Sequence, residues 1–206
     1  MGKFSLTTKV ISKPFDQALR DLKKDNYEII SLTENSYLRI INDHDSNVSR
    51  EGNFTKEGII YIPDKGNYLV RESPILASAK AATTAHKNLK EFNPTMKSIE
   101  IALEDSIKLP DKGAEILVKD FKRNEITAFA FGEHAEEYGH FLRRYGIKSM
   151  PFFVFAEDYN IKQHKPFARQ IWFGSLDNSS DLVGFGRSLS SPENRVCGIK
   201  HHKQVA

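Results

Sequence analysis

Two short apolar runs with an amphipathic segment between them dominate the hydrophobic pattern of the chain. The first run is Ile126–Phe131, the second is Pro151–Ala156, and residues 133–145 lie between them. Short continuous apolar runs are typical of parallel strands that are buried on both faces. A helix of this length between two such strands suits a right-handed crossover. The pattern therefore predicts a strand–helix–strand unit.

The helix of this unit is predicted from the spacing of its apolar side chains. Tyr138, Phe141, Leu142 and Tyr145 recur at steps of three and four residues, so they share one face. Acidic residues come early and basic residues late, in the order that the helix dipole favours. Gly146 follows where a left-handed terminal residue is wanted, which predicts the end of the helix.

Glu136 and His140 lie one turn apart on the opposite face of the same helix. A carboxylate and an imidazole at this separation can share a divalent metal, but the spacing is not that of the His-Glu-x-x-His zinc motif. A solvated helix face accounts for both residues without a metal, and that is our expectation.

The other segments are predicted from the same kinds of pattern, apolar runs or alternation for strands and helical spacing for helices. Strands are predicted at residues 3–11, 27–32, 37–41, 58–62, 67–71, 107–109, 115–121, 167–176 and 195–199, and helices at 14–25, 74–92 and 95–105. The tetrapeptide Pro-Asp-Lys-Gly occurs twice, at residues 63–66 and 110–113. Proline presets the first turn position and glycine accepts a positive φ, so each copy predicts a β-hairpin.

Together these elements predict a mixed α/β fold, with parallel and antiparallel strands in one sheet flanked by helices and a loop-rich C-terminal extension. Residues 1–158 are expected to form the α/β domain, and residues 159–206 a loop-rich, basic extension packed on it. Residues 174–194 contain six Ser and three Gly. That composition is typical of a functional or mobile loop.

Composition narrows the class of protein only slightly. Hydrophobic residues make up 39% of the 206 positions and charged residues 28%, as in ordinary globular proteins. Thirty basic residues against 27 acidic ones do not make a strongly basic chain. The lone cysteine, Cys197, excludes a disulfide within the chain. No apolar run approaches a membrane span, and the first ten residues lack the apolar core of a secretory signal, so we expect a cytoplasmic protein with no membrane partner.

One candidate site comes from Asp111, Asp120 and Lys122. Pro110-Asp111 followed by Asp120-Phe121-Lys122 resembles the motif of the PD-(D/E)xK nuclease superfamily. The resemblance implies two carboxylates that hold Mg²⁺ and a lysine that activates the attacking water. The predicted order of helix, three strands, helix and strand between residues 95 and 156 is similar to the core of that superfamily.

Geometry argues against this nuclease site. If Asp111 and Asp120 bracket one continuous strand, about nine residues at ~3.3 Å each place them roughly 30 Å apart. Two carboxylates cannot share a metal at that distance. The site requires either a bend in the strand or another acid in place of Asp111.

A second candidate site is a basic surface in the C-terminal extension. From residue 159 onward there are seven Lys and Arg against three acids. The candidate binding residues are Lys165, Arg169, Trp172, Arg187 and Arg195. Basic side chains interleaved with aromatic rings suit phosphate contacts and base stacking.

The leading functional hypothesis from the sequence is a non-catalytic intracellular binding module for a polyanion such as nucleic acid. A Mg²⁺-dependent nuclease is the alternative, and Mg²⁺ is expected as a cofactor only in that case. A structural homo-oligomer is the third hypothesis, because the alanine-rich segment 76–92 lets another element approach closely.

Overall fold

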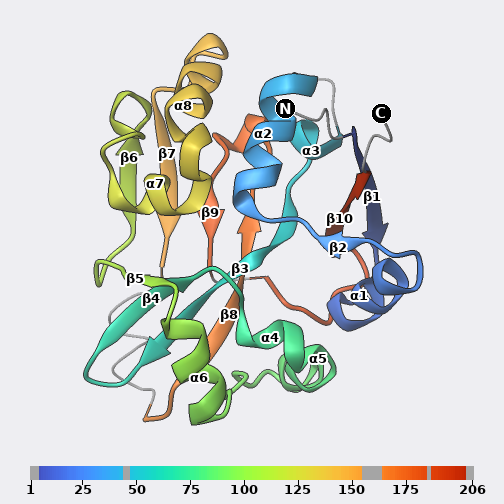
Figure 1. Ribbon diagram of the computed structural model, residues 1–206. Helices are drawn as coiled ribbons and strands as arrows, with labels where there is room; N and C mark the ends of the chain where they lie inside the picture. The colour runs from blue at the N-terminus through green and yellow to red at the C-terminus, as the bar shows by residue number, and fades with distance from the viewer. Residues whose placement is uncertain (1–4, 44–46, 155–163, 185–186, 203–206) are drawn as a thin grey trace.

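The computed structural model describes residues 5–43, 47–154, 164–184 and 187–202, and ten strands of this part form one mixed sheet (Figure 1). Its main path runs β1-β10-β3-β8-β9-β7-β6, while β2 pairs with β10, β4 with β3, and β5 with β4. The strands are β1 (Ser5–Ser12), β2 (Glu28–Ile29), β3 (Asn53–Ile62), β4 (Gly66–Val70), β5 (Ser106–Lys108), β6 (Ala114–Leu117), β7 (Ser149–Phe153), β8 (Phe167–Phe173), β9 (Leu182–Val183) and β10 (Arg195–His202).

Eight α-helices and three short 3₁₀ helices lie in the same described ranges. They are α1 (Phe15–Lys24), α2 (Leu32–Asn42), α3 (Asn47–Arg50), α4 (Pro74–Ala77), α5 (Ala79–Lys87), α6 (Met96–Leu103), α7 (Glu125–Phe131), α8 (Ala135–Arg144), η1 (Val118–Asp120), η2 (Gly132–His134) and η3 (Leu176–Asn178). Side-chain caps start several of them. Ser31 and Glu34 form a capping box on α2, and Thr95 caps α6. None of these helices is both long and apolar enough to cross a membrane.

The strands that come first and last in the chain, β1 and β10, lie side by side in the sheet (Figure 1). β1 and β10 pair antiparallel over eight residues, from Ser5 opposite His202 to Ser12 opposite Arg195. On its other side β10 runs parallel to β3, through Val196 and Phe54. The C-terminal segment therefore contributes β8, β9 and β10 to the sheet in addition to its loops. The boundary predicted at residue 158 lies outside the described residues.

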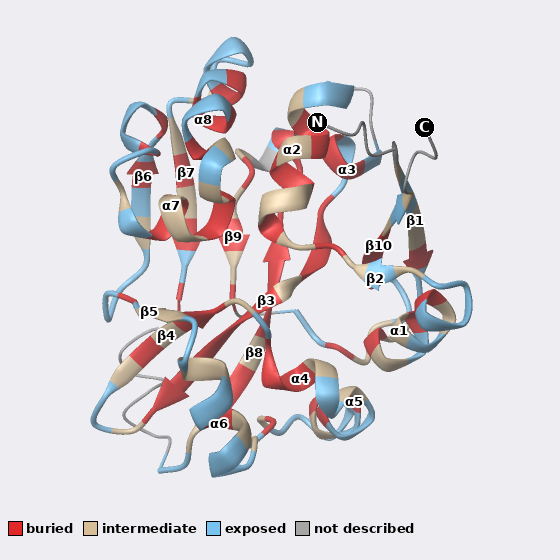
Figure 2. Ribbon diagram, in the orientation of Figure 1, coloured by how far each residue is buried: buried red, intermediate tan, exposed pale blue. Residues whose placement is uncertain are grey.

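The two central strands are buried on both faces (Figure 2). On β3, Ile59 and Tyr61 belong to one hydrophobic cluster, and Ile60 belongs to another. On β8, Phe173 joins the first cluster and Trp172 the second. Side chains alternate across a strand, so each strand supplies both clusters. The first cluster packs against α7 and α8, and the second packs against α1 and α5.

The prediction of a mixed α/β fold is confirmed, but the strand–helix–strand unit is wrong. The apolar run Ile126–Phe131 forms helix α7. Asn124 caps that helix by accepting hydrogen bonds from the backbone N–H groups of Ile126 and Thr127, at 3.0 and 3.2 Å. A short apolar run does not distinguish a buried strand from a buried helix, and here the cap decides. Residues 37–41, also predicted as a strand, lie within α2.

The two Pro-Asp-Lys-Gly turns behave differently. The first joins the antiparallel strands β3 and β4, with Asp64 at φ 63° and Gly66 at φ 93°, so that hairpin is confirmed. The second follows β5 and precedes β6, but β5 pairs with β4 while β6 pairs with β7. The second predicted hairpin is therefore wrong, because pairing with other strands outweighs the local turn.

Candidate functional site

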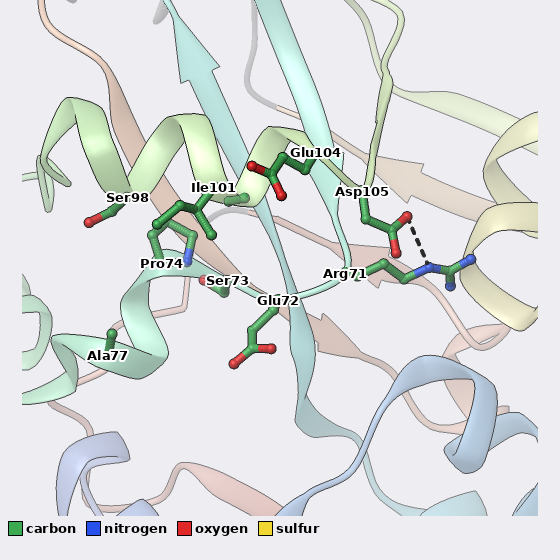
Figure 3. A pocket seen from close by; sticks show the side chains of 10 residues that line it. Arg71, Glu72, Ser73, Pro74, Ala77, Ser98, Ile101, Glu104 and Asp105 are labelled. Atoms are coloured by element: carbon green, nitrogen blue, oxygen red, sulfur yellow. Dashed lines mark ion pairs between the residues drawn. The ribbon is translucent and has the colours of Figure 1, made fainter.

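A pocket of about 390 Å³ opens between the end of β4, the start of α4 and the second half of α6 (Figure 3). Its lining consists of Arg71, Glu72, Ser73, Pro74, Ala77, Ser98, Ile101, Ala102, Glu104 and Asp105. We call it the acidic pocket, because three of its four charged side chains are carboxylates. Its volume lies within the range of small-molecule sites.

Pairing between β4 and β5 brings the two walls of the acidic pocket together. Val70 on β4 lies opposite Ser106 on β5. The next residues on either side, Arg71 and Asp105, then meet, and the Arg71 backbone N–H donates to the Asp105 carbonyl at 3.2 Å. Ser73 turns the chain into α4, with its Oγ accepting from the backbone N–H of Ile75. The pocket is thus anchored to regular structure.

The guanidinium of Arg71 is held by Phe129 and by Asp105. It stacks over the Phe129 ring at 3.9 Å and donates a hydrogen bond to the Phe129 carbonyl. Its Nε lies 3.7 Å from Asp105 Oδ1, the ion pair drawn in Figure 3. Stacking and ion pairing fix the plane of the guanidinium, so Arg71 presents its donors in one orientation.

The carboxylates of the acidic pocket remain accessible to a ligand. Glu72 forms an ion pair with Lys56 at 3.4 Å, but its side chain is 67% exposed, so this pair is weak. Asp105 is 71% exposed. Glu104 is exposed and forms no ion pair with any described residue. Carboxylates only accept hydrogen bonds and a guanidinium only donates them, so the pocket offers both kinds of partner.

An apolar wall completes the acidic pocket. Ile101 on α6 is 58% exposed although it is a large aliphatic residue. It lines the pocket together with Pro74 and Ala77 of α4 and Ala102 of its own helix. An exposed aliphatic side chain inside a concave polar site provides a contact surface for the apolar part of a ligand.

The three residues of the predicted nuclease site have different surroundings. Asp111 is beside the first turn, where a side-chain carbon on Gly66 would come within 3.3 Å of its Oδ1. Asp120 is the last residue of η1, which follows β6 in the chain, whereas Asp111 precedes β6. Lys122 donates to Glu136 of α8 at 2.7 Å. Within the described residues, no group of three or more His, Cys, Asp and Glu is arranged to hold a metal ion.

Most of the predicted basic surface is engaged inside the molecule. Arg169 pairs with Glu91, and Arg195 pairs with Glu51 at 2.5 Å. Trp172 is only 6% exposed, and the Arg187 guanidinium stacks over its ring at 3.8 Å. Lys165 is exposed. Arg187 and Trp172 are thus the two members that the structure brings into direct contact.

Cys197 does not provide a reactive thiol. It is fully buried on β10, and burial raises the pKa of its thiol to about 12. The thiolate is the nucleophilic form, so this cysteine is unreactive near neutral pH. Its role is to pack with Ile30, Leu38 and Ile199.

Comparison with known proteins assigns the fold. No family model and no curated protein matches the sequence. A solved structure from work on the accommodation of massive sequence variation in Nanoarchaeota by the C-type lectin fold is similar, with a TM-score of 0.68 and 12% identity. The match covers 97% of this chain and 99% of that chain. The chain therefore has a C-type lectin fold, a similarity that concerns the fold alone.

This fold overturns the two nucleic-acid functions predicted from the sequence, the polyanion-binding module and the Mg²⁺-dependent nuclease. A PD-(D/E)xK core needs a third strand at residues 126–131, and that segment is α7. The polyanion surface needs an accessible stacking ring, and Trp172 is in the core. Aromatic and basic residues in one segment were not enough to predict a binding surface, because their spacing does not reveal whether each side chain faces the core or the solvent.

The sequence did not identify the acidic pocket. Neither Glu72 nor Glu104 belongs to a site predicted from the sequence. One signal was present: charged pairs stand at the end of a predicted strand, at residues 71–72, and at the end of a predicted helix, at residues 104–105. Their proximity depends on the pairing of β4 with β5, which the sequence pattern does not reveal.

Proposed function

We propose that this protein is a carbohydrate-binding module and that the acidic pocket holds one sugar unit. The observation that carries the proposal is that Arg71, Glu72, Glu104 and Asp105 line one pocket of about 390 Å³ together with an exposed Ile101. A sugar ring carries hydroxyl groups that both donate and accept, together with a face of C–H groups. The pocket offers a complement to each.

The expected contacts follow from the chemistry of the lining. Two neighbouring hydroxyls donate to the oxygens of Asp105 or Glu104, and a third accepts from the Arg71 guanidinium. The C–H face of the ring packs on Ile101. The C-type lectin fold supports the proposal, since a lectin is by name a carbohydrate binder. The carbohydrate is held by direct hydrogen bonds to these side chains.

Charge predicts which sugars the module prefers. Three carboxylates against one guanidinium make the pocket acidic, so neutral sugars and amino sugars fit it, while uronic and sialic acids are repelled. Discrimination against acidic sugars needs no additional contact with the preferred sugar, because repulsion between like charges at close range excludes the acidic one.

The test is binding of the purified protein to an array of neutral, amino and acidic glycans, followed by calorimetry on the best ligand. Asp105→Asn combined with Glu104→Gln is expected to weaken binding at least about tenfold, since each lost charged hydrogen bond costs about 1.5 kcal/mol or more. Glu100→Gln is the matched control, because Glu100 is exposed on α6 but does not line the pocket. Absence of binding to every glycan, or equal binding by all variants, would refute the proposal.

The oligomeric state of the protein affects the apparent affinity measured on the array. Homo-oligomerisation through the alanine-rich segment 76–92 stays a prediction, as does the cytoplasmic location. Linked sites raise apparent affinity on a surface without any new contact. The mass in solution is therefore measured by sedimentation before array affinities are compared.

A further inference from the structure

A second cavity, of about 560 Å³, lies between η1 and α8. Its lining consists of Val118, Lys119, Lys122, Arg123, Glu136, His140 and Arg143. We call it the basic pocket. It shares no residue with the acidic pocket, and its charge is opposite.

The walls of the basic pocket are fixed by the core beneath them. Val118 is buried, and its backbone N–H donates to the Lys148 carbonyl at 3.0 Å. Gly139 of α8 is packed so closely on η1 that an added Cβ would lie 2.5 Å from the Val118 carbonyl oxygen. Phe121, buried in the same cluster, lies against that glycine as well. The cationic side chains therefore project from two elements held in a defined relation.

The basic pocket contains more cationic side chains than are paired with carboxylates of the protein. Lys122 is paired with Glu136 at 2.7 Å. This hydrogen bond, with a smaller contribution from His140, holds the pKa of Glu136 below its usual value. Within the described residues, Lys119, Arg123 and Arg143 form no ion pair. Three cations around one cavity repel each other, and a bound anion relieves that repulsion.

We propose that the basic pocket binds a single phosphate or sulfate group, with Arg123 and Arg143 as its main ligands. The planar guanidinium fork matches two oxygens of such a group, and the two arginines reach the cavity from different elements. Lys119 adds a third charge. Glu136 keeps Lys122 oriented along the rim, so the pocket accepts one compact anion.

The shape of this site separates it from a nucleic-acid surface. A nucleic-acid strand needs a track of cations and aromatic platforms for its bases. Among the described residues, no Phe, Tyr or Trp lines the basic pocket, and its cations surround a single cavity. The site is also independent of the carbohydrate proposal, because neither pocket uses a residue of the other.

The test is a ¹H–¹⁵N NMR titration of the intact protein with inorganic phosphate, sulfate and glucose 6-phosphate, with sodium chloride at matched ionic strength as the reference. Phosphate or sulfate is expected to shift the amides of residues 118–123 and 139–143 in a saturable way, while chloride does not. The comparison of inorganic phosphate with glucose 6-phosphate distinguishes a free ion from a phosphoryl group on a larger molecule. Equal responses to all salts would overturn the proposal.

Variants make the assignment specific. Arg123→Gln and Arg143→Gln are each expected to weaken phosphate binding by about tenfold. Arg144→Gln is the matched control, since Arg144 is the next residue of α8, is exposed, and does not line the cavity. All three side chains are on the surface, so the folded state is retained and far-UV circular dichroism verifies it. An equal loss in the Arg144→Gln variant would mean that net charge, and no built site, attracts the anion.

Discussion

The carboxylate of Glu57 accepts the backbone N–H of Leu32, the first residue of α2, with both of its oxygens at 2.9 and 3.0 Å. Glu57 is 1% exposed and follows Phe54 on β3, where the register with β8 shifts before Gly58. A free N–H at a helix start attracts negative charge. Burial opposes that charge more strongly and raises the pKa of Glu57 to about 7.

The first prediction concerns the pH dependence that Glu57 produces. Its pKa rises from 4.5 in the unfolded chain to about 7 in the folded protein, so the folded state holds the proton more tightly. The free energy of unfolding therefore falls as pH rises from 4.5 to 7 and is flat above that. The shift corresponds to about 3 kcal/mol. In Glu57→Gln this component is absent, because the amide does not titrate.

Urea unfolding of wild type and Glu57→Gln at intervals between pH 4 and 8.5 measures the difference. The variant is expected to gain stability relative to wild type as pH rises, and to lose that advantage in acid. Glu100→Gln, on the exposed side of α6, should follow wild type throughout. A constant difference between wild type and Glu57→Gln would show that the Glu57 carboxyl titrates normally.

His86 is expected to act with the opposite sign. It is buried, its Nδ1 accepts the backbone N–H of Leu189 at 3.2 Å, and burial, aided by the charge of Arg169, lowers its pKa to about 4. The unfolded chain therefore takes up the proton first, and stability is lost as pH falls from 6.5 to 4. His86→Asn keeps an acceptor for Leu189 and cannot be protonated in this range. Its free energy of unfolding should fall less steeply in acid than that of wild type, and a parallel decline would contradict the assignment.

Local chemistry was enough to predict some elements of this fold. The turn at residues 63–66 was predictable because proline and glycine specify its backbone within four residues. The helix at residues 135–144 was predictable because its buried side chains, Tyr138, Phe141 and Leu142, repeat at the helical period. In both cases the information lies within one element.

What could not be predicted depends on contacts between distant segments. A strand was predicted at residues 195–199, but its place between β1 and β3 depends on its partners alone. The acidic pocket joins Arg71 to Asp105 through strand pairing, and the basic pocket joins Arg123 to Arg143 through the packing of α8 on η1. Periodicity within a segment carries no information on which segments meet.

The buried guanidinium of Arg39 leads to the third prediction. Arg39 is fully buried, donates to Asn35, Tyr138 and Ser180, and stacks over the Phe173 ring at 3.7 Å. Its Nη2 has no hydrogen-bond partner among the described residues. A buried cation with an unsatisfied donor is costly, so its packing matters more than its charge.

Arg39→Met keeps much of the volume, and the hydroxyls of Tyr138 and Ser180 still bond to each other at 2.9 Å. We expect Arg39→Met to change the free energy of unfolding by less than about 1.5 kcal/mol. Arg39→Ala leaves a cavity and is expected to cost about 3 kcal/mol or more. Urea denaturation of both variants decides the matter. Equal destabilisation by Met and Ala would mean that the hydrogen bonds of the guanidinium, and not its packing, stabilise this part of the core.

Gly139 tests the close contact on which the basic pocket depends. In the interior of a helix, replacing glycine by alanine ordinarily stabilises a protein by about 1 kcal/mol. At this position the new Cβ would meet the Val118 carbonyl at 2.5 Å, so α8 has to move away from η1. Gly139→Ala is therefore expected to destabilise the fold by about 1–3 kcal/mol, the reverse of the usual sign. Glu137→Ala, on the exposed face of the same helix, controls for helix propensity.

The same variant separates the walls of the basic pocket without removing a charge. Because Arg143 moves with α8 while Arg123 follows η1, their guanidinium groups would no longer converge on one anion. Phosphate affinity measured by the NMR titration should fall in Gly139→Ala although all four Lys and Arg side chains of the pocket remain. Unchanged affinity in a measurably destabilised variant would show that the anion is attracted by charge alone, and the geometric assignment of its ligands would fail.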